Sequence, residues 1–279
     1  MPTVSYAQNG EDIVLRRVFP PGHRGFYIDV GANNPLEDTV TRYFYEQGWD
    51  GINIEPGDIF SQVAAHRPRD VNLNVGVSNV TGVQKFYDFP DYPGSSTYCE
   101  HQATIHRRDH GFRCIERSVP IATLKAICDL HVRRPIDFIS IDVEGLERQV
   151  LEGADWERYR PVVVVIEATR PNTGIPSHRD WEDILWQAQY RFALFDGLNR
   201  YYVRAEDAHL LSALSAPASC IDDYVPYRHL RMVQELQSRL ALIEGVGPRS
   251  LAIARQINLV AKRVRKVTWR LKHLVRRAA

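Results

Sequence analysis

The sequence lacks the features that would place the protein outside the cytoplasm. Its four cysteines (Cys99, Cys114, Cys128 and Cys220) form no Cys-x-x-Cys pair, so we expect free thiols in a reducing compartment. Residues 1–10 have neither the basic nor the apolar region of a secretion signal. The longest aliphatic run, residues 162–166, is too short to cross a bilayer. We therefore expect a cytoplasmic protein.

Acidic residues are missing from the end of the chain. Residues 249–279 hold ten Lys or Arg and no Asp or Glu, so 25 basic and 34 acidic residues give the first 248 residues a formal charge of −9. An acidic body with a basic tail predicts that the tail has a partner of its own. Nucleic acid is not expected as that partner, because no nucleic-acid-binding module is visible and the body is acidic.

Glycine-rich phosphate-binding motifs are also missing. No G-x-x-x-x-G-K-[ST] sequence is present, which excludes a P-loop. After the apolar stretch at residues 26–30, Gly31 stands alone, with Ala32, Asn33 and Asn34 where the later glycines of G-x-G-x-x-G would begin. This turn disfavours NAD and FAD, whose pyrophosphate needs close approach of the backbone. A cofactor without phosphate, such as S-adenosylmethionine, tolerates it.

Short apolar strands alternate with helical segments along the first 204 residues. This order predicts an α/β fold, with a mostly parallel sheet and helices on both faces. The expected strands are residues 26–30, 51–55, 71–77, 83–89, 136–141 and 162–166, and the expected helices are residues 38–47, 58–66, 123–130, 146–152 and 180–189. Residues 191–195 and 200–204 flank Asp196-Gly-Leu-Asn199, which predicts a terminal antiparallel hairpin.

These elements predict two parts of the chain. Residues 1–204 are expected to form the catalytic domain, in which the polar stretch at residues 91–118 is an irregular, lid-like insertion over the site. Residues 205–279 are expected to be a helical appendage, with a basic amphipathic helix from about residue 249.

Acids follow the first two strands, at the sheet edge where open α/β folds bind ligands. Asp29 could organise the cationic methionine end of S-adenosylmethionine, directly or through water, and Glu55 could accept hydrogen bonds from both ribose hydroxyls. Val77 and Ser78 end the third strand, where an adenine ring could bind. The alternative is that Asp29 and Glu55 only cap the helices that follow their strands.

Several of these segments resemble one enzyme family. Ser5-Tyr-Ala-Gln-Asn-Gly-Glu-Asp12, Phe26-Tyr-Ile-Asp-Val-Gly-Ala-Asn33, Asn53-Ile-Glu-Pro56, Ile136-Asp-Phe-Ile-Ser-Ile-Asp-Val-Glu-Gly145 and Phe195-Asp-Gly-Leu-Asn-Arg-Tyr-Tyr-Val203 look like the FkbM family of S-adenosylmethionine-dependent methyltransferases. The resemblance covers residues 3–204 in the right order. It implies a seven-stranded class I methyltransferase fold and methyl transfer to hydroxyl oxygens of sugars or natural products. It also implies that Asp29, Gly31, Ala32, Asn33 and Glu55 bind the cofactor and that Gln8 and Asn9 fold over it. We expect Pro56, Val77, Ser78 and Asp142 at the strand ends to complete the cofactor site.

A hydroxyl is a poor nucleophile, so we expect a general base near the reacting atoms. Asp142 and Glu144 lie two residues apart beyond the fourth strand, so both carboxylates can face the site. His178, in the loop after the fifth strand, is a third candidate, because imidazole titrates near neutral pH. The alternative for His178 is an ordinary surface histidine.

A divalent cation is possible but not favoured at the same place. Asp142, Glu144 and Glu167 are neighbouring carboxylates that could hold Mg²⁺ in an oxygen site. Equally, Glu144 could cap the next helix and Glu167 could bind a backbone amide or the substrate.

The insertion at residues 91–118 is expected to contact substrate. Its cysteines and histidines match no familiar zinc-binding spacing, and nearby arginines would oppose a cation, so zinc is not expected. Ser96 and His106 are the substrate-binding candidates here, joined by Glu167 and by Asn172 in the loop that precedes His178.

Apolar residues in the tail repeat with spacings of four and three, from Ile253 to Leu274. This heptad seam predicts either a helix that packs on the core or on a second copy of the chain, or a basic amphipathic helix on an anionic membrane. Membrane contact would place the protein at the inner face of the cell membrane.

We expect an S-adenosylmethionine-dependent O-methyltransferase that acts on a sugar hydroxyl of a glycolipid, a surface polysaccharide or a glycosylated natural product. Two alternatives remain open at this point: an NAD-dependent Rossmann-type enzyme, and a non-catalytic scaffold that assembles through its helical tail.

Overall fold

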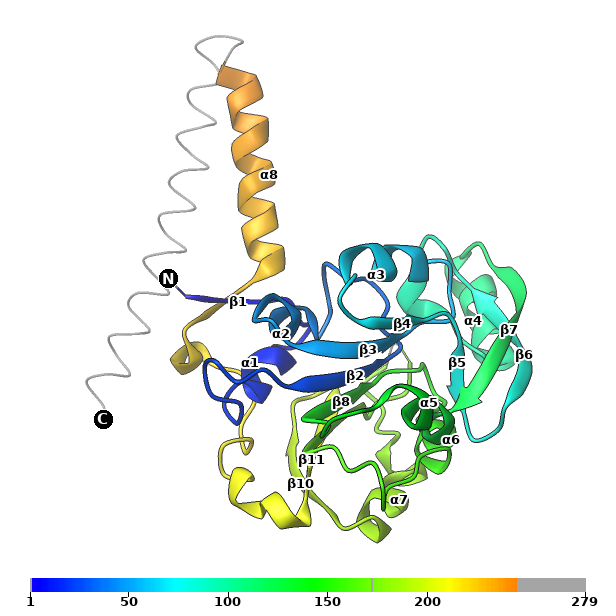
Figure 1. Ribbon diagram of the computed structural model, residues 1–279. Helices are drawn as coiled ribbons and strands as arrows, with labels where there is room; N and C mark the ends of the chain where they lie inside the picture. Colours follow the sequence, from blue (N-terminus) through cyan, green and yellow to red (C-terminus); the bar gives the residue numbers. More distant parts are fainter. Residues whose placement is uncertain (1, 172, 245–279) are drawn as a thin grey trace. The chain divides into compact units, whose positions relative to one another are not determined.

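The computed structural model describes residues 2–171 and 173–244 (Figure 1). The chain divides into two compact units, one of Ala7–Pro217 and a smaller one of Met1–Tyr6 with Ala218–Ala279. The larger unit continues past the boundary predicted at residue 204. The expected heptad seam and the basic tail lie outside the described residues.

The larger unit is built on a mixed sheet with the strand order β10-β11-β9-β8-β2-β3-β4. Its strands, in that order, are Tyr190–Phe195, Asn199–Arg204, Val163–Glu167, Phe138–Ile141, Phe26–Val30, Asp50–Ile54 and Val71–Leu73. Each neighbouring pair from β9 to β4 is parallel, whereas β11 runs antiparallel to both β9 and β10. All carboxyl ends of the parallel strands therefore meet at one edge.

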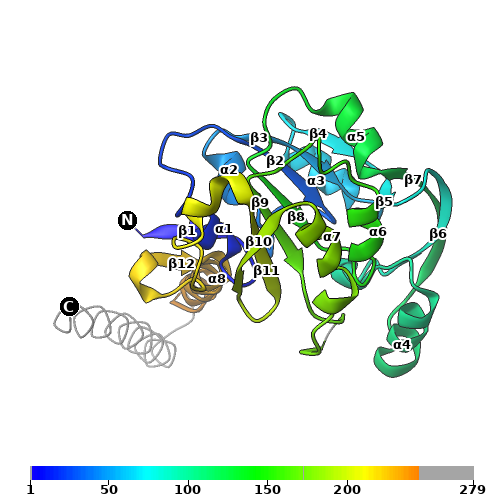
Figure 2. The same cartoon turned by 90° about the horizontal axis from the view of Figure 1, so that it is seen from below.

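Helices cover both faces of this sheet, which is why most residues of the inner strands are apolar. Every residue of β2 and β9 is buried. On one face, α5 (Leu124–His131), α6 (Glu147–Glu152) and α7 (Glu182–Gln187) share a core with Ile28, Ile139 and Val164 (Figure 2). The other face carries α1 (Glu11–Leu15), α2 (Arg42–Glu46) and α3 (Phe60–His66). An aromatic cluster lies there, in which the rings of Phe44 and Phe138 are 4.8 Å apart.

A second, three-stranded sheet of order β5-β7-β6 extends from the main one. It contains Gly76–Ser78, Ile115–Thr123 and Gly82–Asp88. The single strand expected at residues 71–77 is therefore wrong, because β4 and β5 belong to different sheets. The turn at residues 74–75 lets the chain leave the first sheet for the second.

The insertion at residues 91–118 is not irregular, as the sequence analysis expected. It contains the short 3₁₀ turn η1 (Pro93–Ser95), the helix α4 (Glu100–His110) and the start of β7. Its Phe112 and Cys114 pack against buried Ala103 and against Tyr87 and Phe89, which precede the insertion, and the rings of Tyr92 and Phe112 stack at 3.9 Å. A small hydrophobic cluster therefore joins the insertion to β6.

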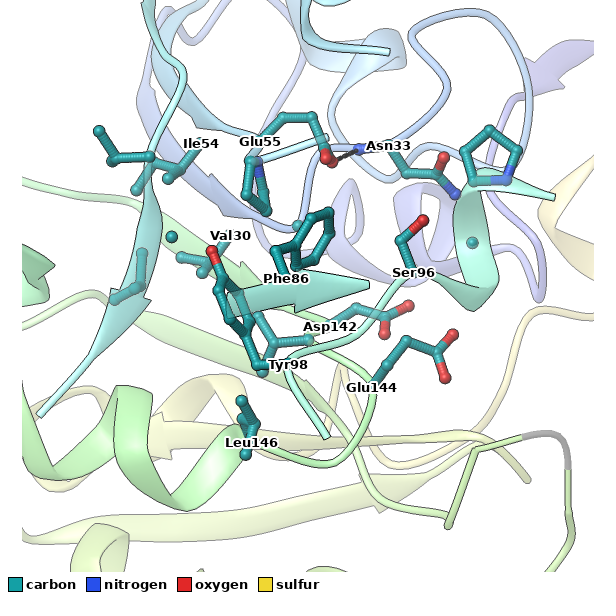
Figure 3. Close-up of a pocket in the computed structure, with 18 residues that line it drawn as sticks. Val30, Asn33, Ile54, Glu55, Phe86, Ser96, Tyr98, Asp142, Glu144 and Leu146 are labelled. Atoms are coloured by element: carbon teal, nitrogen blue, oxygen red, sulfur yellow. Dashed lines mark hydrogen bonds between the residues drawn. The ribbon is translucent and has the colours of Figure 1, made fainter. Parts of the chain in front are cut away.

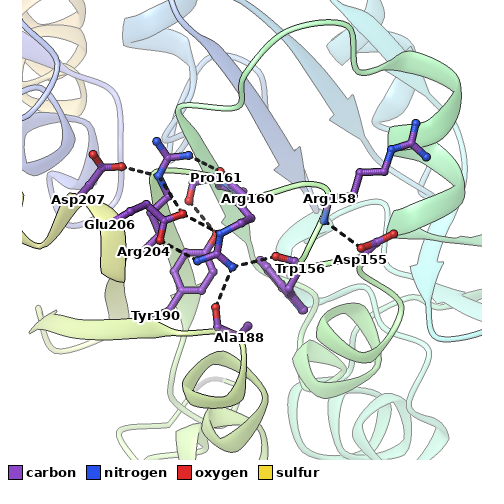
Figure 4. A network of polar contacts seen from close by, with 10 residues as sticks. All are labelled: Asp155, Trp156, Arg158, Arg160, Pro161, Ala188, Tyr190, Arg204, Glu206 and Asp207. Atoms are coloured by element: carbon purple, nitrogen blue, oxygen red, sulfur yellow. Dashed lines mark hydrogen bonds and ion pairs between the residues drawn. The ribbon is translucent and has the colours of Figure 1, made fainter.

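A polar network closes the amino end of the sheet, opposite the edge where the acids gather (Figure 4). The Arg160 guanidinium donates to the carbonyls of Trp156 and Ala188, at 2.9 Å each, and pairs with Glu206 at 2.8 Å. Arg204 donates to the Arg160 carbonyl at 3.0 Å. Because Glu206 belongs to η3 (Ala205–Leu210), this network holds the segment after the hairpin in the larger unit.

In the smaller unit, β1 (Thr3–Ser5) pairs in parallel with β12 (Tyr224–Pro226). The 3₁₀ turn η4 (Cys220–Asp222) precedes β12 in the chain. The helix α8 (Tyr227–Glu244) follows directly. On it, Met232, Val233 and Leu236 are partly exposed to solvent. Among the described residues, no helix combines the length and the apolar character needed to cross a membrane.

Candidate functional site

A pocket opens at the carboxyl ends of β2, β3 and β8, beside β5 and the insertion (Figure 3). It encloses about 620 Å³ of space free of protein atoms, part of which is open to solvent. Eight residues that the sequence analysis proposed for cofactor, substrate or catalysis line it: Gly31, Asn33, Glu55, Pro56, Val77, Ser96, Asp142 and Glu144.

Gly31 is required where β2 turns into this pocket. Its backbone has a φ of +84°, which side-chain-bearing residues rarely adopt, and a Cβ atom there would lie 1.8 Å from the Asp142 carbonyl oxygen. The Gly31 amide donates to the Ile54 carbonyl at 3.0 Å. This one residue therefore lets the ends of β2, β3 and β8 converge.

Glu55 both caps local backbone and faces the pocket. One carboxylate oxygen accepts from the Asn33 amide at 2.9 Å and the other from the Gly57 amide at 2.7 Å. Each oxygen keeps capacity for a second hydrogen bond. Burial raises the pKa of Glu55 to about 7, helped by the charges of Asp88 and Asp29. Glu55 can therefore bind local backbone amides and still accept hydrogen bonds from a ligand in the pocket.

Asp29 is buried beneath the pocket and is not among the residues that line it. Thr41 Oγ1 donates to its carboxylate at 2.7 Å. Burial raises the pKa of Asp29 to about 6. This position suits the indirect role considered from the sequence better than direct contact.

An acidic cluster at the ends of β8 and β9 contains Asp142, Glu144, Glu147 and Glu167. Asp142 and Glu167 are hydrogen-bonded to each other through their side chains. Burial first, and then the charge of Asp142, raises the pKa of Glu167 to about 11, so the pair of carboxyls holds a proton at neutral pH. Solvent reaches Asp142 through the pocket, although protein atoms crowd it on its other sides, and this crowding raises its pKa as well.

Glu144 lies beside this pair in a left-handed backbone conformation, with a φ of 54°. Its Oε2 atom is buried and has no hydrogen-bond partner among the described residues. Burial raises the pKa of Glu144 well above its usual range, and the charges of Asp142 and Glu147 raise it further. The cluster therefore binds protons tightly and would be stabilised by a cation.

The possible magnesium site at Asp142, Glu144 and Glu167 finds no support. Within residues 2–171 and 173–244, no group of three or more His, Cys, Asp or Glu side chains is arranged to hold a metal ion. Of these three carboxylates, Asp142 and Glu144 line the pocket, whereas Glu167 is buried and does not.

Other predicted residues lie away from the pocket lining. Ala32 and Ser78 are buried. Gln8 and Asn9 are exposed, and the Asn9 amide donates to Glu11 at 2.7 Å. Asn172 lies outside the described residues.

Neither candidate histidine lies at the pocket. His106 is buried inside the insertion, where it packs against Phe89 and Phe112, so its position does not support contact with substrate. His178 lies near Arg200 and Glu182, and burial followed by the charge of Arg200 lowers its pKa. This makes His178 a weaker base than free histidine.

Two aromatic residues of the pocket were not predicted from the sequence. Phe86 and Tyr98 line the pocket, and no apolar periodicity marks either of them. Glu11, which is not part of the lining, is buried and accepts from the Asn199 side chain at 2.7 Å. This contact joins two of the segments that carried the family resemblance, and their separation along the chain hid it.

The methyltransferase FkbM domain matches residues 29–192 of the chain. The chain belongs to the FkbM methyltransferase family. No curated protein matches it.

The matched segment of this FkbM methyltransferase begins at Asp29 on β2 and ends at Phe192 on β10. It therefore includes every residue that lines the pocket. Membership establishes a methyltransferase of class I fold.

Proposed function

We propose that the protein transfers a methyl group from S-adenosylmethionine to a hydroxyl oxygen. The acidic character of the pocket carries this proposal. Among the described residues that line it, the ones with carboxyl groups are Glu55, Asp142 and Glu144, and none is Lys or Arg. An acidic pocket favours the cationic sulfonium and ammonium groups of S-adenosylmethionine and opposes the pyrophosphate of NAD.

The residues present also fit the parts of this cofactor. Glu55 has two carboxylate oxygens with spare acceptor capacity for the ribose hydroxyls, and the acids at Asp142 and Glu144 suit the cationic end. Val77 and Phe86 supply apolar surface at the other end of the pocket. When bound, S-adenosylmethionine supplies a methyl group on a positively charged sulfur.

Asp142 is the residue best suited to take the proton of the acceptor hydroxyl. It lines the pocket, and its raised pKa makes it a stronger base than a free aspartate. Glu144 is the second candidate. His178 is set aside, because it does not line the pocket.

We further propose a sugar as the acceptor, on a glycolipid, a surface polysaccharide or a glycosylated natural product. Asp142 and Glu144 line the pocket two residues apart, and their carboxyl oxygens can accept hydrogen bonds, which suits adjacent sugar hydroxyls. A basic tail at residues 249–279 would hold the enzyme at an anionic inner membrane face, where a glycolipid acceptor lies. The seam in this tail could instead join two copies of the chain.

Calorimetry tests the cofactor. S-adenosylmethionine and S-adenosylhomocysteine should bind, whereas NAD should not. Glu55→Ala should weaken S-adenosylmethionine binding by ~1.5–3 kcal/mol, the scale of hydrogen bonds to a charged group. Tight NAD binding would favour the dehydrogenase alternative, and absence of binding by either cofactor would favour the scaffold.

A further inference from the structure

Tyr98 is held in the pocket by contacts on both sides of it in the sequence. Its neighbour Thr97 exchanges two backbone hydrogen bonds with Tyr87, at 2.9 and 3.1 Å. Thr97 Oγ1 also accepts from the Cys99 amide at 3.0 Å and reaches the Glu144 carbonyl at 3.4 Å. The Tyr98 ring lies 4.7 Å from the Phe86 ring. Tyr98 is therefore presented to the pocket by ordered backbone.

The Tyr98 hydroxyl reaches the third strand end. A Cβ atom at Gly76 would lie 1.9 Å from this hydroxyl, so only glycine leaves room for it at position 76. The hydroxyl is buried and has no hydrogen-bond partner among the described residues. A phenol can both donate and accept, and leaving it unpaired in the interior destabilises the protein. A ligand that supplies a partner there would recover that cost.

The position of the Tyr98 hydroxyl indicates which part of the cofactor would supply its hydrogen-bond partner. Figure 3 shows the Tyr98 hydroxyl directed away from the carboxylates of Asp142 and Glu144. Its end of the pocket is lined by apolar side chains, among them Val30, Ile54 and Val77. A flat aromatic base with polar edge atoms suits such a site, whereas the charged amino-acid end suits the acids.

We propose that Tyr98 recognises the adenine base of the cofactor through a hydrogen bond from its hydroxyl. The proposal rests on the proposed use of S-adenosylmethionine. The proposal assigns recognition of the adenine base to the insertion at residues 91–118, which also contributes Ser96 to the pocket lining. Gly76 is the positioning residue that admits the hydroxyl.

Calorimetry with S-adenosylhomocysteine tests this assignment on the full chain. Tyr98→Phe should weaken binding about 3- to 10-fold, as expected for one buried hydrogen bond. The same loss should occur with 5′-methylthioadenosine, which keeps the base and ribose but lacks the amino-acid group. Gly76→Ala should weaken both ligands as well, because its methyl group displaces the hydroxyl. Tyr92→Phe, in the same insertion but outside the pocket lining, is the matched control and should bind like wild type.

Each other outcome is informative. If wild type binds S-adenosylhomocysteine and Tyr98→Phe binds it equally well, the assignment of Tyr98 is overturned and the proposed function stands. If Tyr98→Ala binds more tightly than wild type, Tyr98 blocks the pocket rather than serving it, and the assignment is again overturned. If wild type binds neither ligand, the proposed function fails together with the inference.

Discussion

The buried acids predict that the ligand-free protein becomes more stable as the pH falls from 8 to 5. Glu55 shows the reason. Its pKa is about 7 when folded and 4.5 in the unfolded chain, so the folded state holds a proton that the unfolded state has lost between these values. Its stabilising contribution is fully present below pH 4.5 and is lost as the pH rises through about 7.

The magnitude follows from the two pKa values. At about 1.4 kcal/mol for each pKa unit, their difference corresponds to about 3 kcal/mol of unfolding free energy. Glu55→Gln cannot ionise, so its unfolding free energy should change with pH by about that much less than the wild-type value. The variant also alters the hydrogen bonds from Asn33 and Gly57, but that effect is the same at every pH.

Urea unfolding at pH 5, 6, 7 and 8 measures this difference. Glu157→Gln, at an exposed position, is the matched control and should keep the wild-type dependence on pH. If Glu55→Gln and wild type show the same dependence, Glu55 ionises as easily in the folded protein as in the unfolded chain, and the electrostatic account of the pocket is wrong.

The remaining predictions concern chemistry, metal and the tail. Asp142→Asn should lower turnover by ~10²-fold or more when S-adenosylmethionine is saturating, the usual range for a general base. His178→Gln should leave turnover unchanged, and a large loss there would return the base to that histidine. EDTA should leave methyl transfer intact, and inactivation that magnesium reverses would revive the metal site. Deletion of residues 249–279 should preserve cofactor binding but abolish co-sedimentation with anionic liposomes, as should high salt for the full chain. Loss of a dimer instead, with no liposome binding by the full chain, would identify the tail as an oligomerisation segment.

The sequence revealed the inner strands and the acids that follow them, because a strand buried on both faces is mostly apolar. Helix ends were harder to predict. The helix expected at residues 38–47 spans only Arg42–Glu46, since Asp38 has a φ of 56° and the chain before Thr41 turns. The helix α4 was missed because it is polar and buries only Ala103 and His106.

Site residues were predictable where they follow a strand end and unpredictable where they come from the insertion. Gly31, Glu55 and Asp142 could be placed from their strands alone. Tyr98 depends on the pairing of Thr97 with Tyr87, a contact that no local pattern encodes. His106 was assigned to substrate on chemical type, whereas its side chain is buried inside the insertion.

The small cluster that joins the insertion to β6 has an evolutionary consequence. Tyr87 and Phe89 pack with Ala103, Phe112 and Cys114 of the insertion, apart from the core around the main sheet. Exposed residues of α4 can therefore be exchanged while the strand ends that line the pocket remain unchanged. Because no residue of α4 lines the pocket, such exchanges should diversify the surface of the protein without altering the pocket, which makes α4 a suitable segment for attaching a label or a new binding surface.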